Sequence, residues 1–116
     1  MDQVLPNLKK KLGDKWLLFK TIHQDILSIH RNIDFRVFPI YISYYLDERM
    51  IAVVYFGGKF VTKHDLNVGL SLRKRPKSKR FVGAKYMKYP GIVYSIKLSN
   101  RANVPNILLK ELKHLI

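Results

Sequence analysis

The spacing of the apolar residues changes near residue 35, and this change restricts the folds that the chain can adopt. Upstream, from Lys15 to about His30, apolar residues recur at helical spacing, which predicts an amphipathic helix with one buried stripe. The stripe consists of Phe19, Ile22, Ile26 and Ile29, widened by Trp16, Leu17 and Leu18. Downstream, β-branched and aromatic residues dominate, as they do in strands. Helical spacing returns over residues 104–115.

Turn signals divide the strand-like region into shorter segments. The predicted strands are residues 40–46, 50–56, 59–62, 66–72 and 91–98. Turns are predicted at Asp47–Arg49 and Gly57–Gly58, and Asp34 is predicted to start a turn before the first strand. The prediction is a single α+β domain over residues 1–116, with an antiparallel sheet of about four to five strands flanked by an N-terminal and a C-terminal helix. Residues 1–13 are expected to form an approach segment or a short helix, and Asp14 is expected to cap the first main helix.

The segment 73–88 lies between two predicted strands and contains eight cations and no acid. The cations are Arg73, Lys74, Arg75, Lys77, Lys79, Arg80, Lys85 and Lys88. They supply +8 of the formal net charge of +14. Because positive side chains are costly to bury without partners, residues 73–90 are expected to form an exposed basic loop. A positive field this concentrated is typical of proteins that bind polyanions, of which nucleic acid is the commonest.

Aromatic residues accompany this charge. Phe81, Tyr86 and Tyr89 lie in or beside the segment, and such rings can stack on unpaired bases or pack in a core. Tyr86 joins the eight cations in the predicted binding set. The tyrosines between residues 41 and 55 have two interpretations: they form an exposed aromatic platform on the sheet, or they are buried beneath the helices.

Composition excludes several classes of protein. The chain is 47% apolar and 26% charged, which is too apolar for a disordered tail. It contains no cysteine, which excludes a disulfide scaffold, a cysteine zinc site and a thiol nucleophile. No apolar run is long enough to span a membrane, and the first residues lack a signal-peptide pattern. We therefore expect a soluble, cytoplasmic protein with no membrane partner.

No motif specifies a reaction. The histidines lack the i, i+4 spacing of a metal site and are expected to be surface and capping residues. The tripeptide 111–113, Glu-Leu-Lys, matches half of a restriction-type nuclease signature, but it lies in a predicted helix without a partner aspartate nearby in sequence. It is interpreted as an exposed charge pair. Phosphate-binding glycine motifs are missing. The prediction is no enzyme, no catalytic residue, no metal and no cofactor.

Several apolar stretches carry a resemblance to a known family. They are Trp16–Phe19, Tyr41–Tyr44, Met50–Val54 and Leu66–Leu72, followed by the last strand and the last helix. Their order resembles a small family of domains of unknown function that occur alone or at the C-termini of nuclease-associated proteins. It also looks similar to the MmcQ/YjbR group, whose fold is frataxin-like and has been discussed as DNA-binding. The resemblance implies an α+β fold with helices on one sheet face, and it carries over no catalytic residue.

The charge pattern leads to a functional prediction. The chain is expected to be a non-enzymatic module that binds nucleic acid through residues 73–88, with help from Lys59, Lys63 and Lys97 and with weak sequence selectivity. DNA and RNA both remain open as partners. One alternative is an interaction module that docks on an acidic protein or dimerises through a sheet edge. Another is a metal-dependent nuclease whose aspartates are brought together by the fold.

Overall fold

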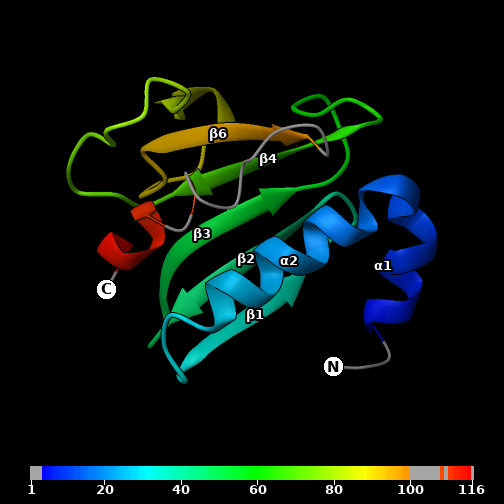
Figure 1. Ribbon diagram of the computed structural model, residues 1–116. Helices are drawn as coiled ribbons and strands as arrows, with labels where there is room; N and C mark the ends of the chain where they lie inside the picture. The colour runs from blue at the N-terminus through cyan, green and yellow to red at the C-terminus, as the bar shows by residue number, and fades with distance from the viewer. Residues whose placement is uncertain (1–3, 100–107, 109, 116) are drawn as a thin grey trace.

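The computed structural model describes residues 4–99, 108 and 110–115, and it confirms the α+β class (Figure 1). The helices are α1 (Val4–Leu12) and α2 (Trp16–Leu27), with 3₁₀ turns η1 (Gly13–Lys15), η2 (Lys85–Met87) and η3 (Lys113–Leu115). Residues 108 and 110–112 are also helical and form part of a short C-terminal helix. The predicted start of that helix, residues 104–107, lies outside the described residues.

Six antiparallel strands form one sheet in the order β1-β2-β3-β4-β6-β5. They are β1 (Ile33–Val37), β2 (Tyr41–Leu46), β3 (Arg49–Tyr55), β4 (Asp65–Leu70), β5 (Val82–Gly83) and β6 (Tyr94–Ser99). β3 lies inside the sheet between β2 and β4, and its residues 51–55 are all buried. This agrees with its nearly continuous apolar sequence, which is typical of a strand covered on both faces.

Three strand predictions need correction. Asp34 does not start a turn but lies within β1, an edge strand in which half-buried and exposed residues alternate. β5 was not predicted, because two residues are too short to show a strand pattern. Residues 59–62 are not a strand. Gly58 has a φ of +80°, and the ring of Phe60 packs edge-on against Tyr55 at 5.0 Å, so the chain folds back over the sheet instead of extending it.

The main core lies between the helices and one face of the sheet. Phe19, Ile22 and Ile26 of α2 are at most 1% exposed and share a cluster with Leu108, Leu112 and Leu115 from the C-terminal end, as the helical spacing predicts. Figure 1 shows α2 lying across this face. Leu17, by contrast, is 73% exposed. It lies two positions from Phe19, about 200° around the helix, and therefore does not widen the stripe.

The junction between α1 and α2 also differs from the prediction. Gly13, at a φ of +59°, begins the 3₁₀ turn that connects the two helices. Lys15 occupies the N-cap position of α2, and no side-chain hydrogen bond caps it. Asp14 therefore does not cap this helix, and its carboxylate instead pairs with His64 at 2.9 Å.

The second face of the sheet is covered by a chain segment, not by a helix. Ala84, Met87 and Ile92 pack there against Val53 and Tyr55 of β3. The segment approaches the sheet so closely that a Cβ added to Gly69 would lie 2.6 Å from a methyl group of Ile92 and 3.0 Å from one of Val53. Glycine at position 69 is therefore required for this packing.

The β2–β3 hairpin turns at Asp47 and Glu48, as predicted. Both residues have positive φ, at 49° and 72°, the signs that a two-residue type I′ turn requires. Type I′ turns favour asparagine, aspartate and glycine, so Asp47 suits this conformation, whereas the hairpin pairing imposes it on Glu48.

Candidate nucleic-acid interface

The predicted basic loop lies between β4 and β6, which are neighbours in the sheet. All eight of its cations are exposed, as the charge pattern predicts. The segment is nevertheless not a simple loop, because it contains β5 and η2. Buried residues at intervals hold it to the domain; these are Pro76, Phe81, Ala84 and Met87. The cations are thus displayed from a segment that is anchored by apolar packing.

Glu111 attaches the first half of the segment to the C-terminal helix. Its Oε1 accepts a hydrogen bond from the backbone N–H of Lys77 at 3.2 Å, and Glu111 is only 7% exposed. The expectation of an exposed charge pair at 111–113 is therefore wrong for its acid. A hollow of about 320 Å³ lies at this contact, lined by Arg73, Lys74, Arg75, Lys77, Glu111 and His114. The carboxylate serves as a backbone anchor within a cationic surface.

A second hollow lies at the edge of the sheet that β5 and β6 form, and we call it the β5–β6 hollow. It has a volume of about 500 Å³ and is lined by Lys59, Phe60, Arg80, Val82, Tyr86, Ser95 and Lys97. Lys59, Arg80, Tyr86 and Lys97 were named from the sequence, and the fold brings them together here. Phe60 and Val82 were missed, because one was assigned to a strand and the other has no distinguishing chemistry. Among the residues that the structure describes, no acid lines this hollow.

Tyr86 is held in place from behind. Its hydroxyl accepts a hydrogen bond from Asn67 Nδ2 at 2.8 Å and lies 2.7 Å from Ser95 Oγ. Asn67 and Ser95 are fully buried. The ring of Tyr86 meets that of Phe60 edge-on, with centroids 5.2 Å apart and planes at 78°. Tyr86 is nevertheless 41% exposed, so a fixed aromatic ring faces the hollow.

The other two aromatics proposed for stacking are not available in this way. Phe81 is 7% exposed and belongs to the main core. Tyr89 is half-buried and packs edge-on against Tyr41 at 5.6 Å. Burial, followed by the hydrogen bond with Tyr41, raises the pKa of Tyr89 well above its usual range. Tyr44 and Tyr55 are buried, and Tyr41 and Tyr45 are half-buried, so these four tyrosines do not form an open platform.

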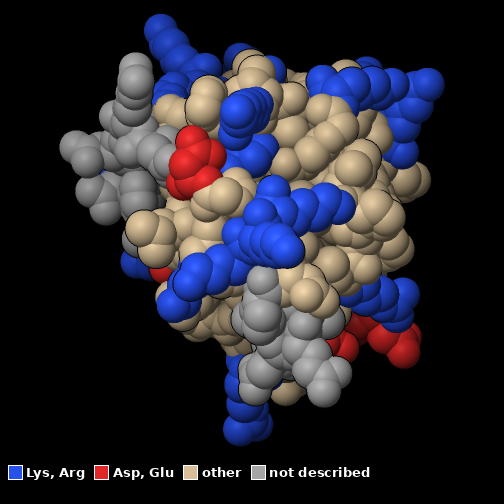
Figure 2. Space-filling model, turned by 90° about the vertical axis from the view of Figure 1, so that its right-hand side faces the viewer, with Lys and Arg blue, Asp and Glu red and all other residues tan. Residues whose placement is uncertain are grey.

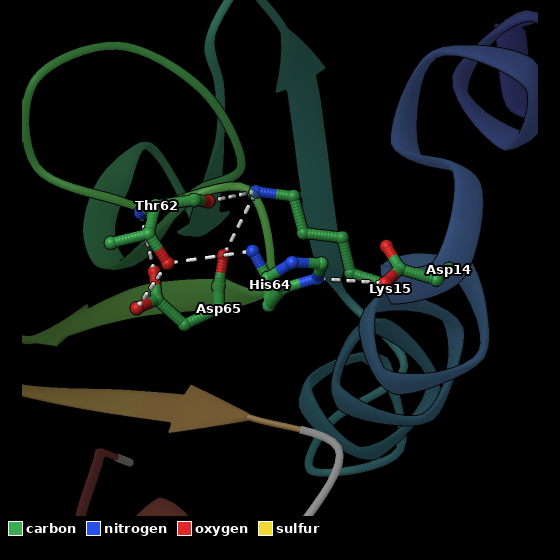
Figure 3. Close-up of polar contacts among 5 residues, drawn as sticks. All are labelled: Asp14, Lys15, Thr62, His64 and Asp65. Carbon is green, nitrogen blue, oxygen red and sulfur yellow. Dashed lines mark hydrogen bonds and ion pairs between the residues drawn. The ribbon is translucent and has the colours of Figure 1, made fainter.

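A polar network restrains the connection that carries Lys59 and Phe60 (Figure 3). Lys15, which is 6% exposed, donates from Nζ to the backbone oxygens of Thr62 and Asp65, both at 2.9 Å. Burial lowers the pKa of this ammonium group. The Asp65 carboxylate in turn accepts from the N–H and the hydroxyl of Thr62 at 2.7 and 2.8 Å. One wall of the β5–β6 hollow is thereby tied to the start of α2.

The prediction of surface and capping histidines is wrong for His23. His23 is 4% exposed, stacks on Phe19 with centroids 5.5 Å apart and meets Phe35 edge-on at 4.7 Å. Its Nδ1 lies 2.7 Å from the hydroxyl of Tyr44, and its buried Nε2 has no hydrogen-bond partner among the described residues. Burial lowers the pKa of His23 to about 4. It is a neutral core residue.

The part of the chain that the structure describes contains no set of side chains that could bind a metal ion. No group of three or more His, Cys, Asp or Glu side chains lies close enough there to hold a metal ion. Asp14 and His64 form an exposed pair whose hydrogen bond lowers the pKa of Asp14, and Asp65 is engaged by Thr62. Neither of these two aspartates belongs to a cluster of possible metal ligands among the described residues.

Positive charge extends beyond the segment 73–88. The chain has 22 Lys and Arg residues against 8 acids, so most of its cations lie elsewhere. Figure 2 shows the side of the molecule on which α1 lies, with Lys and Arg spread widely over it and few acids among them. A test of the segment must therefore separate its own contribution from the overall charge.

No protein-family model, curated protein or solved structure matches this chain. The resemblance to the domain-of-unknown-function family and to the MmcQ/YjbR group thus stays a prediction. None of the helices in residues 4–99, 108 and 110–115 is long and apolar enough to cross a membrane.

Proposed function

We propose that this chain is a non-enzymatic, cytoplasmic module that binds nucleic acid through the surface of residues 73–88. The observation that carries the proposal is the exposure of all eight cations on one acid-free segment that buried residues anchor to the domain. Because the segment is anchored, it loses less conformational entropy on binding than a flexible loop with the same charges would lose. Lysine and arginine attract phosphates and release their condensed counterions, which supplies affinity.

Binding of this kind is weakly sequence-selective. Contacts to phosphate carry no sequence information, and the segment contains no α-helix that could enter a major groove and read base edges. Lys59 and Lys97 add to the positive surface at the β5–β6 hollow. An acidic protein would be attracted by the same cations, so the experiment includes it as an outcome.

The test is the salt dependence of binding, measured by fluorescence anisotropy on labelled duplex DNA, single-stranded DNA and structured RNA. If about four of the eight cations contact phosphates, the slope of log K against log salt on duplex DNA is roughly −3 to −4. Changing Arg73, Lys74, Arg75 and Lys77 together to alanine should flatten the slope and weaken binding to all sequences alike. Heparin and polyglutamate serve as competitors that carry charge without nucleic-acid structure.

A matched variant controls for overall charge. Lys9, Lys10, Lys20 and Arg31 are all exposed on other parts of the surface, and changing them to alanine removes the same four charges. This variant should bind nucleic acid with nearly the affinity of the wild type. Equal weakening by both variants would reduce the effect to net charge. No binding to any nucleic acid at low salt would overturn the proposal, and stronger binding to polyglutamate would favour an acidic protein partner.

A further inference from the structure

The β5–β6 hollow differs in kind from the rest of the positive surface. Cations alone attract phosphate, but this hollow also exposes the ring of Tyr86 beside Phe60 and Val82. Its volume of about 500 Å³ is in the range of sites that accept small organic groups. Ring faces and cations at one place suit a partner that combines a flat aromatic group with negative charge.

We propose that the β5–β6 hollow binds one unpaired base of a single-stranded nucleic acid, while Lys59, Arg80 and Lys97 hold the adjoining phosphates. This inference rests on the proposed function and narrows its substrate to single strands or unpaired loops. The faces of bases inside a duplex are covered by their neighbours, so only an unpaired or extruded base can enter such a site.

The geometry of the two rings suits stacking. Phe60 and Tyr86 are nearly perpendicular, so a base that stacks on one ring lies beside the other. The hydrogen bonds that link the Tyr86 hydroxyl with the buried Asn67 and Ser95 fix one ring in advance, and a fixed platform loses little conformational entropy when a base binds. Stacking depends weakly on base identity, because every base has a π-face.

The charges are placed to hold the backbone of such a strand. Lys59 Nζ lies 5.5 Å from the centroid of Phe60, and Arg80 Nη2 lies 3.5 Å from the backbone oxygen of Lys97. Lys59, Arg80 and Lys97 are all exposed, and the described lining residues include no carboxylate that would repel a phosphate. The hollow thus offers an apolar aromatic centre with a cationic border, as single-strand sites do.

The experiment compares three labelled probes of equal length at one salt concentration: an oligothymidylate, a duplex, and an abasic strand that has the same phosphates but no bases. Stacking of one base should make the oligothymidylate bind about 5- to 150-fold more tightly than the abasic strand. Tyr86→Ala should remove most of this ratio, whereas Tyr86→Phe, which keeps the ring, should preserve most of it.

A second pair of variants keeps the test valid if Tyr86→Ala unfolds. Val82 lines the hollow and Val93 does not, and they are 54% and 47% exposed. Val82→Glu should abolish the preference for the strand with bases, while Val93→Glu, with the same change of charge, should retain it. Equal binding of the thymidylate and abasic strands would overturn the inference, as would a preference that survives Val82→Glu. In both cases, salt-dependent binding to all three probes would still support the proposed function. Loss of binding to all three probes would contradict both the inference and the proposed function.

Discussion

The buried His23 should make the protein less stable in mild acid. The pKa of His23 is about 4 in the folded state, against an ordinary value of 6.5. As the pH falls below 6.5, the unfolded chain takes up a proton that the folded protein does not accept. The stabilisation is therefore complete above pH 6.5 and is lost progressively as the pH falls towards 4.

The size of the loss follows from the difference between the two pKa values. Each pKa unit corresponds to about 1.4 kcal/mol, so the whole interval is worth about 3 kcal/mol. With these pKa values, about 2 kcal/mol of this falls between pH 7 and pH 5, where most carboxylates are still ionised. The slope at its steepest is about 1.2 kcal/mol per pH unit, because the two states then differ by slightly less than one bound proton.

The assay is urea unfolding at pH 7, 6 and 5 at constant ionic strength, followed by the fluorescence of Trp16. His23→Gln removes the titrating ring but leaves a side chain that can hydrogen-bond with Tyr44, so its stability should vary much less with pH in this interval. His114→Gln is the control, since His114 is exposed, and it should keep the wild-type dependence. An equal loss of unfolding free energy in wild type and His23→Gln would refute the reasoning.

The same urea titration at pH 7 checks two predictions about packing. Phe19 is fully buried, so Phe19→Ala should lower the free energy of unfolding by about 3 to 5 kcal/mol. Leu17→Ala, on the exposed side of the helix, should lower it by less than about 0.5 kcal/mol. A loss below about 1 kcal/mol for Phe19→Ala would contradict the core assignment. Gly69→Ala should cost about 1 to 3 kcal/mol by overpacking against Ile92 and Val53. Gly83→Ala, with nothing within 4 Å of the added Cβ, is its control, and equal stability of the two glycine variants would show that the covering segment can move away.

The sequence was most informative where a periodic pattern reflects burial. The stripe of α2 and the alternation of β4 predicted the main core, because one side of each element faces it. β1 was missed because, as an edge strand, it mixes Asp34 and Arg36 with its apolar residues. The role of Glu111 was not predictable, because it depends on a contact with Lys77 that is 34 positions away in the chain.

The sequence predicted most of the residues of the candidate site but not their arrangement in space. The eight cations had to be exposed, since none had a partner in the pattern. Phe81, Tyr86 and Tyr89 are chemically alike, however, and only tertiary packing leaves Tyr86 open while it covers the other two. Phe60 lines the hollow because the connection between β3 and β4 folds back over the sheet. Local strand propensity does not predict the course of such a connection.

The placement of the basic segment also bears on how the sheet assembles. β2 and β3 are joined by a two-residue turn, whereas β4 and β6 can pair only after residues 71–93 close into a loop. Hairpins with short connections form within microseconds, and long loops close at a larger entropic cost. Closing this loop also draws eight like charges together. We therefore expect the β4–β6 half of the sheet to form last. Salt, which screens that repulsion, should accelerate folding, although it should weaken the proposed binding to nucleic acid.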